Sequence, residues 1–565
     1  MSYRLILLFT LFFLPLSIFA ANSNNKFGIH LAQPNTEEFS KVKELVNSNG
    51  GDWGYITLVI QENDRNKEKW QDIFDQLRLY HLIPIIRLAT SPEGENWRRP
   101  ETKDAQSWVD FLDSLNWVTK NRYITLFNEP NHGREWGGET DEKSYAEVSL
   151  EFAKKLKEKN PDFFVMLAGF DASAPSWSPG MEDEEVFLRR LSLDKDSLQY
   201  IDGWASHSYP NPGFSGSSNG YGRGTVRTYE WELELLKELG VNKELPVFIT
   251  ETGWVGNEQK LNRETVAEYF KSAYENVWLP DARVVAVTPF VFDYQGDPFL
   301  EFSWKQHNSQ EFYQQYYTVQ NMSKTKGEPE QIEKGWINFR LPTDLVVQST
   351  YHFKVKINNL GQAIWDKDDG YQLNRSESVY PEQSRRVESV KSVEFLFDDL
   401  KSINPFEEKE VGFTLKTNEG LGNKKIKFIL QKDCKNILES DPPAGGWKIN
   451  ILPLPTAKFE TSFFPFGSGR GEDYEIQIFD IEDRLVFKKK NISVKKGVGE
   501  LKNIQNIALD ELYRVVIIKP YHLPRQEFVV FKKDDNKIKF KSMLPFDFNN
   551  DGAFNSKDIT SIFKK

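Results

Sequence analysis

The chain has 565 residues, enough for several domains, and a formal net charge of −11 from 72 Lys and Arg against 83 Asp and Glu. This acidic balance argues against a nucleic-acid partner, because it implies no broad basic surface. The single cysteine, Cys434, excludes an internal disulfide and a cysteine-rich metal site.

The N-terminus has the pattern of a secretory signal peptide, which we predict to span residues 1–20. A positively charged start precedes an apolar run from Leu5 to Ala20, and the small Ala20 and Ala21 suit a cleavage site. The alternative is an uncleaved membrane anchor, although this run is shorter than the roughly 20 residues of a spanning helix. We therefore predict an exported chain, secreted or associated with the cell surface, with no membrane segment after cleavage.

Residues 26–318 alternate apolar, strand-like runs with segments of helical periodicity. Apolar residues three and four positions apart, as in Trp70, Ile73 and Phe74, place one apolar stripe on each helix. Eight such units predict an α/β fold in which a parallel sheet closes into a (β/α)8 TIM barrel, while an open doubly wound sheet is the alternative. The strand-like runs lie near residues 26–33, 53–61, 83–89, 122–128, 163–170, 201–208, 246–251 and 284–292.

Two of these runs end in a glutamate. The fourth, RYITLFNEPNH, places Glu129 after a buried strand, and the seventh, PVFITETGW, ends in Glu251. Buried strands seldom carry unpaired charge, and catalytic groups of such barrels lie at the carboxyl ends of strands. We therefore expect both glutamates at the barrel mouth. Such a pair predicts glycosidic-bond cleavage, in which one carboxyl group protonates the leaving oxygen and the other attacks the sugar or activates water.

The sequence NEP ending the fourth strand, with a glutamate ending the seventh, resembles the clan A glycoside hydrolases, which are retaining enzymes on the (β/α)8 barrel. The resemblance covers roughly residues 26–318. It implies that Glu129 is the general acid/base, that Glu251 is the nucleophile and that Asn128 bonds the sugar 2-hydroxyl. Many clan members carry a tryptophan at the end of the eighth strand, where this chain has Phe290. The sugar and the linkage therefore stay open.

Other residues at strand ends are predicted to bind substrate. Arg87 ends the third strand, where its charge would hold Glu251 ionised, although a salt bridge at the rim is the alternative. His207 and Tyr209 follow the sixth strand, and the resemblance implies that such residues bond the nucleophile or the sugar. A structural role is the alternative for His207 and for the remaining candidates, which are His30 at the first strand, Trp254 after Glu251, and the loop aromatics Trp136, Trp177 and Tyr221.

Beyond the barrel, the polar segment 321–335 predicts a linker. Residues 336–453 alternate with period two, which predicts an immunoglobulin-like β-sandwich with Trp365 in its core. Residues 454–541 predict a second small all-β domain of the same kind. Neither β domain contains a cofactor or catalytic motif, and we expect no cofactor for catalysis.

The last segment, 542–565, contains DFNNDGAFNSKDI, which has the spacing of a calcium-binding loop with glycine at its sharp turn. An EF-hand has Glu at position twelve. Asp there resembles the loop of dockerins, which attach secreted enzymes to cohesin scaffolds and carry two such loops, whereas this chain has one. Ca2+ is therefore expected, a cohesin-like scaffold is one candidate partner, and a solvated acidic tail is the alternative. The predicted ligands are Asp547, Asn549, Asp551, Ala553, Asn555 and Asp558.

Together these patterns predict a secreted retaining glycoside hydrolase that cleaves β-glycosidic bonds of a polysaccharide or glycoconjugate. One alternative is a catalytically inactive glycan-binding or adhesive surface protein, although both glutamates are present. Another is a structural surface protein in which the β domains carry the function.

Overall fold

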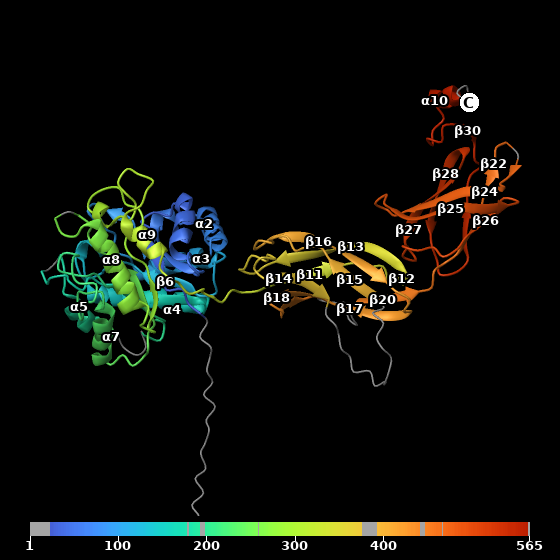
Figure 1. Cartoon of the computed structure of the whole chain (residues 1–565). Coiled ribbons are helices and arrows are strands. Elements are labelled where there is room, and N and C mark those ends of the chain that lie inside the picture. The colour runs from blue at the N-terminus through green and yellow to red at the C-terminus, as the bar shows by residue number, and fades with distance from the viewer. Residues whose placement is uncertain are drawn as a thin grey trace, which may run out of the picture. The chain divides into compact units, whose positions relative to one another are not determined.

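The computed structural model describes residues 23–177, 180–191, 198–257, 259–375, 393–440, 447–465 and 467–562. The predicted signal peptide, residues 1–20, lies outside these ranges. Two compact units divide the chain, Met1–Ile332 and Glu333–Lys565 (Figure 1). Among the described helices, none combines the length and the apolar character that crossing a bilayer requires.

Eight parallel strands frame the first unit within the described residues. Five pair in the order β1-β2-β3-β6-β7 and three in the order β10-β9-β8. Parallel bridges from Met166 to Gly203 and from Phe27 to Val287 join the two sets into a closed ring. β6 is thus the fourth strand of the ring and β9 the seventh. The strands are β1 (Gly28–His30), β2 (Gly54–Gln61), β3 (Leu82–Ala89), β6 (Arg122–Leu126), β7 (Phe163–Leu167), β8 (Trp204–His207), β9 (Val247–Glu251) and β10 (Val284–Val287). A short hairpin, β4 (Pro92–Glu93) with β5 (Asn96–Trp97), follows β3.

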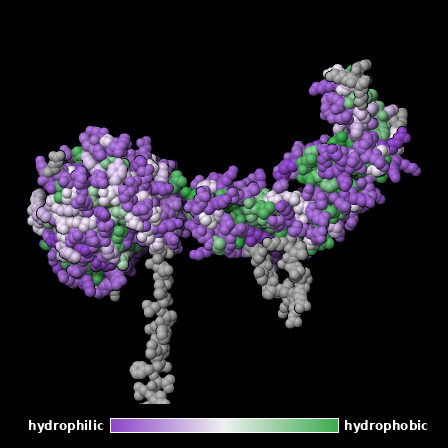
Figure 2. Space-filling view, in the orientation of Figure 1, coloured by the Kyte–Doolittle hydropathy of each residue, from purple (hydrophilic) through white to green (hydrophobic). Residues whose placement is uncertain are grey.

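Helices alternate with the strands and pack their apolar stripes on the outside of the ring, where they form the main core. Asn66, Asp141 and Asn262 cap three of them by accepting a hydrogen bond from a backbone N–H of the first turn. The face of this unit seen in Figure 2 is mostly hydrophilic. The helices are α1 (Phe39–Val46), α2 (Lys67–Leu79), α3 (Ala105–Asp113), α4 (Glu142–Lys159), α5 (Glu184–Arg190), α7 (Thr228–Glu238), α8 (Arg263–Ala273) and α9 (Gln314–Gln320).

A second, smaller core fills the inside of the ring. Because successive side chains of a strand point to opposite faces, every strand that packs outward also supplies inward-pointing residues. These inner residues are large and apolar, so the ring is a packed core rather than a channel. They include Tyr55, Ile83, Ile85, Tyr123, Met166 and Phe248.

The predicted linker, residues 321–335, packs on the first unit over most of its length. Gly327 donates a backbone hydrogen bond of 2.9 Å to Asp52. Lys324 is buried at the C-terminal end of α9, where a cation is favoured by the helix dipole. Its Nζ donates to the carbonyl oxygens of Val319, Gln320 and Met322. The polar residues of this segment therefore bind backbone groups of the first unit, which extends to Ile332.

The second unit begins with a module that has one apolar core and three small sheets. Their orders are β11-β13-β16-β15, β12-β20-β17 and β14-β18-β19. Trp365 is fully buried in this core, and its Nε1 donates to Glu333 Oε2 at 2.8 Å. The immunoglobulin-like topology stays a prediction. The strands are β11 (Gly335–Phe339), β12 (Asp344–Val346), β13 (Ser349–Asn359), β14 (Tyr371–Arg375), β15 (Val393–Phe397), β16 (Glu408–Thr417), β17 (Gly422–Ile426), β18 (Phe428–Lys432), β19 (Lys435–Glu439) and β20 (Trp447–Leu452).

The C-terminal module has a separate core and one eight-stranded sheet in the order β29-β21-β26-β25-β24-β27-β28-β30. This pairing differs from the predicted sandwich, which needs two facing sheets. β30 pairs with β28, so the predicted tail, residues 542–565, begins inside the sheet. The elements are β21 (Ala457–Glu460), β22 (Ser462–Phe463), β23 (Gly467–Ser468), β24 (Gly471–Phe479), β25 (Leu485–Lys495), β26 (Val498–Leu501), β27 (Leu512–Lys519), β28 (Tyr521–Val530), β29 (Asn536–Lys539), β30 (Pro545–Asp547) and α10 (Ser556–Ile562).

Trp365→Ala should destabilise the first β module by about 3–5 kcal/mol, because it leaves a cavity and an unpaired Glu333 oxygen. Calorimetry of the full chain measures this as a lower unfolding temperature for that module. Trp336→Ala is the matched control, since Trp336 is 36% exposed on β11, and it should cost less than about 1 kcal/mol. Equal effects of the two substitutions would contradict the placement of Trp365 in the core.

Candidate active site

Glu129 and Glu251 meet at the carboxyl-terminal end of the ring. Glu251 is the last residue of β9, and Glu129 follows β6 by three residues. An oxygen of one carboxyl group lies within 4.8 Å of an oxygen of the other. Glu251 is buried, with 7% exposure, and Glu129 is half-buried. The two strand-end carboxylates therefore share one small space, although they differ in access to water.

The chain makes a sharp turn where it delivers Glu129. Phe127 and Glu129 have positive φ angles of 71° and 29°. Residues other than glycine rarely adopt this backbone conformation. The turn is held by Glu129 N, which donates to Gly169 O at 3.1 Å, and by His132 N, which donates to Glu129 O at 2.8 Å. Such unfavourable backbone at a strand end is common at functional sites, where the surrounding structure enforces it.

Three neighbouring side chains hold the Glu251 carboxylate. Arg87 Nη1 donates to Oε1 at 2.8 Å, and the Tyr209 hydroxyl donates to Oε2 at 3.0 Å. His207 Nδ1 lies 3.9 Å from Oε2. Burial alone would raise the pKa of Glu251, but the attraction of His207 and Arg87 and the Tyr209 hydrogen bond outweigh it and lower that pKa. Glu251 is therefore kept ionised in a buried place.

His207 connects the two glutamates. Its Nδ1 lies 2.8 Å from Glu129 Oε1, and its ring is 2% exposed. Burial lowers the pKa of His207, but the charges of Glu251 and Glu129 outweigh burial and raise it. The ring lies close to Gly169, where an added Cβ would come within 2.1 Å of His207 Cδ2. Glycine at this position is thus a steric requirement of the site.

Asn128 is positioned by the same arginine. Arg87 Nη1 donates to Asn128 Oδ1 at 2.6 Å as well as to Glu251. This shared donor fixes the amide group of Asn128 relative to the carboxylate of Glu251. One guanidinium therefore orients two of the residues predicted from the sequence.

A third carboxyl group, Glu135, belongs to this cluster and was not predicted. It ends the short 3-10 helix η4 (Gly133–Glu135) that follows Glu129. Burial raises the pKa of Glu135 to about 7; Glu129 and Glu251 add to the rise, and Arg87 and Asn128 oppose it. Only its distance of six residues from Glu129 could have drawn attention to it in the sequence, since it lies in neither a strand nor a periodic helix.

Of the remaining predicted residues, His30 lies beneath the cluster. It is 1% exposed, and its Nδ1 is 3.7 Å from Glu251 Oε1. Burial lowers the pKa of His30 to about 3, Arg87 and His207 contribute to the fall, and Glu251 opposes it. The ring of Phe290, beyond β10, packs edge-on against His30 at 5.2 Å. The neutral imidazole is therefore a packing neighbour of Glu251.

Trp254 does not lie in the mouth, contrary to the prediction. It is 1% exposed and packs on Phe270 and Tyr269 of α8, while its Nε1 donates to Gly216 O at 2.8 Å. The chain turns after Glu251, so the indole joins the apolar stripe of the helix. Trp136 is likewise buried, against Phe127.

Two loop aromatics remain accessible. Trp177 is 59% exposed and Tyr221 is 77% exposed. Trp177 pairs with Met181, which in turn bridges to His132, three residues after Glu129. The Arg227 guanidinium lies 4.6 Å from the ring of Tyr221. Trp177 is thus on a loop next to the site and is a largely exposed aromatic residue of the kind that stacks on ligands.

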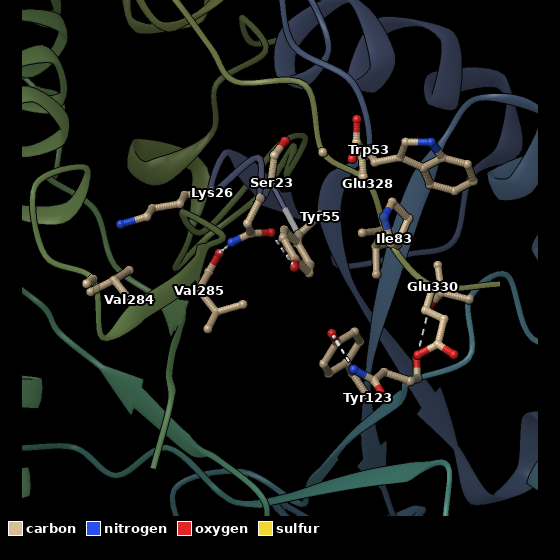
Figure 3. A pocket seen from close by; sticks show the side chains of 16 residues that line it. Ser23, Lys26, Trp53, Tyr55, Ile83, Tyr123, Val284, Val285, Glu328 and Glu330 are labelled. Atoms are coloured by element: carbon tan, nitrogen blue, oxygen red, sulfur yellow. Dashed lines mark hydrogen bonds between the residues drawn. The ribbon is translucent and has the colours of Figure 1, made fainter. Parts of the chain in front are cut away.

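The opposite end of the ring holds a cavity of about 370 Å3, which Figure 3 shows from close by. Tyr55, Ile83 and Tyr123 line it from the beginnings of β2, β3 and β6. Glu330, which also lines it, pairs with Lys120 at 2.6 Å. This cavity therefore lies at the wrong end of the strands for the carboxylate pair.

The positions of Glu129, His207 and Glu251 also resemble a metal-ligand set, since one atom of each lies within 4.8 Å of the others. The charge of Arg87, 2.8 Å from Glu251, already neutralises that carboxylate. A metal ion there would be repelled by the guanidinium at close range. The arrangement favours two carboxyl groups that act on an organic substrate.

No family model and no curated protein matches this chain. A monomeric beta-xylosidase from Caulobacter crescentus CB15 has a similar structure at 12% identity and TM-score 0.40, covering 89% of this chain and 98% of that chain. An endo-beta-1,4-glucanase from Xanthomonas axonopodis pv. citri is similar at 11% identity and TM-score 0.34, covering 52% of this chain and 97% of that chain. A beta-mannanase from Thermomonospora fusca is similar at 11% identity and TM-score 0.32, covering 49% of this chain and 82% of that chain. At these low values the likenesses carry no weight beside the geometry of the site.

Gly169→Ala should displace the His207 ring, since the added methyl group would overlap it. The hydrogen bond to Glu129 would then be lost, and the pKa of His207, which the two carboxylates raise, should fall. Titration of the histidine ring signals by NMR measures this change. Gly296→Ala is the control, because a Cβ at Gly296 meets open space. An unchanged His207 titration in Gly169→Ala would contradict the proposed packing.

Proposed function

We propose that this chain is a secreted retaining glycoside hydrolase that cleaves β-glycosidic bonds of a polysaccharide or glycoconjugate. In this proposal the ring of eight strands is a (β/α)8 barrel of the clan A type. Glu129 is the general acid/base and Glu251 the nucleophile. Export rests on the pattern of residues 1–20 alone.

The separation of the two carboxyl groups is the observation that carries the proposal. In retaining enzymes the carboxyl groups stand about 5–5.5 Å apart, whereas inverting enzymes need about 6.5–9.5 Å to admit a water molecule. Here the oxygens approach within 4.8 Å. This distance supports direct attack by one carboxylate on the sugar, followed by hydrolysis of the glycosyl-enzyme.

The surroundings of Glu251 suit a nucleophile. Its lowered pKa keeps the carboxylate ionised as substrate arrives. Arg87 and Tyr209 hold both oxygens in place, which reduces the entropy cost of reaching an attacking geometry. When an ester forms, Glu251 loses its charge, and Arg87 still has Asn128 as a hydrogen-bond acceptor.

Glu129 suits proton transfer. Among the described residues, the hydrogen bonds of its carboxyl group involve Oε1 only, through His207. We assign Oε2 to the leaving oxygen and later to the attacking water. His207 acts as a positioning residue, because it touches both glutamates and is too buried to reach a polymer directly. Asn128, held by Arg87, is assigned to the sugar hydroxyl next to the reacting carbon.

A glycan-binding protein without turnover is the second candidate. The exposed ring of Trp177 favours it, because an aromatic platform binds sugars whether or not a bond is broken. The two candidates differ in a single measurable property, which is covalent chemistry at Glu251.

Incubation with a panel of 2-deoxy-2-fluoro-β-glycosides that carry a dinitrophenyl leaving group should produce a covalent adduct on Glu251. The fluorine slows both the formation and the hydrolysis of the glycosyl-enzyme. The good leaving group restores the rate of formation only, so the glycosyl-enzyme accumulates. Mass spectrometry of the peptide that contains Glu251 detects it. Sugars that are turned over without forming any adduct on this residue would overturn the retaining mechanism.

Glu129→Gln separates the roles of the two residues. It should lower turnover of substrates with poor leaving groups by about 10²–10⁴-fold, the usual contribution of general acid catalysis. Adduct formation from dinitrophenyl glycosides, which need no acid, should persist. Glu139→Gln, at an exposed carboxylate nearby, is the matched control and should behave as wild type. Binding without turnover in the unmodified chain would favour the second candidate.

The pH profile should depend on Arg87. Activity falls on the acid side as pH drops through the lowered pKa of Glu251, because the protonated form cannot attack. Arg87→Met removes a positive charge 2.8 Å away, so the pKa of Glu251 should rise. The acid limb of kcat/KM should then move by about one pH unit or more to higher pH.

Arg134→Met is the control for this shift. Arg134 lies next to Glu135 in η4, is 73% exposed, and has no contact with Glu251 among the described ion pairs. Its substitution should leave the acid limb in place. If Arg87→Met also left the limb unchanged, Arg87 would not set the ionisation of Glu251.

A further inference from the structure

Three carboxylates come together in the loop after β30. One oxygen from each of Asp547, Asp551 and Asp558 lies within 4.8 Å of the others. Two oxygens bound to the same Ca2+ are separated by at most twice the Ca–O distance, or about 5 Å for distances of 2.3–2.6 Å. The three side chains are therefore already as close as a single calcium ion would bring them.

Two of these carboxylates are buried without a compensating charge. Asp547 is 3% exposed and Asp558 is fully buried. Asp547 Oδ1 has no hydrogen-bond partner among the described residues, and none of the ion pairs found there involves these three aspartates. Burying an unpaired oxygen and neighbouring negative charges is costly. This buried, unpartnered oxygen is the independent sign that a cation belongs in the cluster.

Backbone N–H groups of the loop hold the carboxylate oxygens of Asp547 and Asp558 in place. Asp547 Oδ2 accepts from Gly552 N at 3.1 Å, and Asp558 accepts from Phe548 N and Asn555 N at 2.9 and 2.8 Å. Gly552 has a φ of +83°, which a residue with a side chain rarely adopts. All the candidate ligands are hard oxygens, which Ca2+ prefers: Asp547, Asn549, Asp551, Ala553, Asn555 and Asp558.

The first of these ligands is also a residue of the eight-stranded sheet. Asp547 ends β30 and pairs with Tyr521 of β28. Tyr521 N donates to Asn550 Oδ1 at 2.9 Å, and Leu523 N donates to Leu544 O at 2.8 Å. A cation that fixes Asp547 would therefore also fix the edge of the sheet.

We propose that Asp547–Asp558 is a structural Ca2+ site that holds β30 against β28 and so completes the sheet of the C-terminal module. The ion joins the first turn of α10, through Asp558, to the sheet edge, through Asp547. The loop is thereby an internal part of the module, and its calcium acts on stability within the chain. This proposal does not depend on the glycosidase proposal.

Calcium chloride added to the full chain after EGTA treatment tests the proposal. Isothermal titration should show one site. At a Ca2+ concentration 100-fold above the dissociation constant, hydrogen exchange that requires loop opening should slow by about a hundredfold. The slowing should reach the Tyr521 and Leu523 amides in β28 as well as the loop. Mg2+ at equal concentration should have little effect, because it demands a smaller octahedral site.

Asp551→Asn is the test variant, since Asp551 is exposed and its loss of charge should leave the fold intact. We expect Ca2+ affinity to fall by about tenfold or more, with the loss of one charged ligand. Asp534→Asn, at an exposed aspartate between β28 and β29, is the matched control and should bind Ca2+ as wild type does.

Three outcomes would overturn the proposal. The first is the absence of heat or protection on adding Ca2+ to the unmodified chain. The second is equal Ca2+ affinity in the two variants. The third is protection confined to the loop while β28 exchanges as before. That last result would leave a loop that binds Ca2+ without holding the sheet, as expected of a docking module for a cohesin-like scaffold.

Discussion

The charge of Glu251 has to be balanced inside the protein, because an isolated carboxylate out of water costs several kcal/mol. Arg87, at the end of β3, and His207 and Tyr209, at the end of β8, supply that balance. The ring of strands is what brings them together, since no two of them are close in the sequence except His207 and Tyr209. Arg87 also holds Asn128, and His207 also holds Glu129. The whole arrangement of the mouth therefore depends on compensation of one buried charge.

The sequence predicted where the strands lie and that Glu129 and Glu251 stand at strand ends, for a physical reason. A charged residue at the end of an apolar strand is conspicuous, and the eight-unit pattern places such ends at one face. Side-chain direction beyond a strand end was not predictable in this way. Trp254 follows Glu251 by three residues, yet the chain turns between them and the indole packs against Phe270 of α8. Glu135 lacks any periodic context, so its approach to Arg87 and Asn128 became visible only in three dimensions.

In the β modules, too, the sequence pattern predicted the strands but not how they pair. Period-two alternation indicated strands with one buried face, and β13 and β16 alternate in this way. Alternation does not specify which strand pairs with which, because each register with the same buried face satisfies it. The C-terminal module thus has one continuous sheet where two facing sheets were predicted. For the same reason, the sequence did not predict the pairing of β30 with β28, by which the predicted tail, residues 542–565, begins inside the sheet.

The burial of Lys324 also determines where the first unit can be cut. A fragment that stopped after α9, at residue 320, would remove the ammonium group that satisfies carbonyl oxygens at the end of that helix. It would also remove Glu328, Pro329 and Glu330, which line the cavity at the base of the ring. The inner aromatic residues Tyr55 and Tyr123 would then face water directly. The compact unit that contains the carboxylate pair therefore extends to Ile332, and its polar final stretch lines the cavity at the base of the ring.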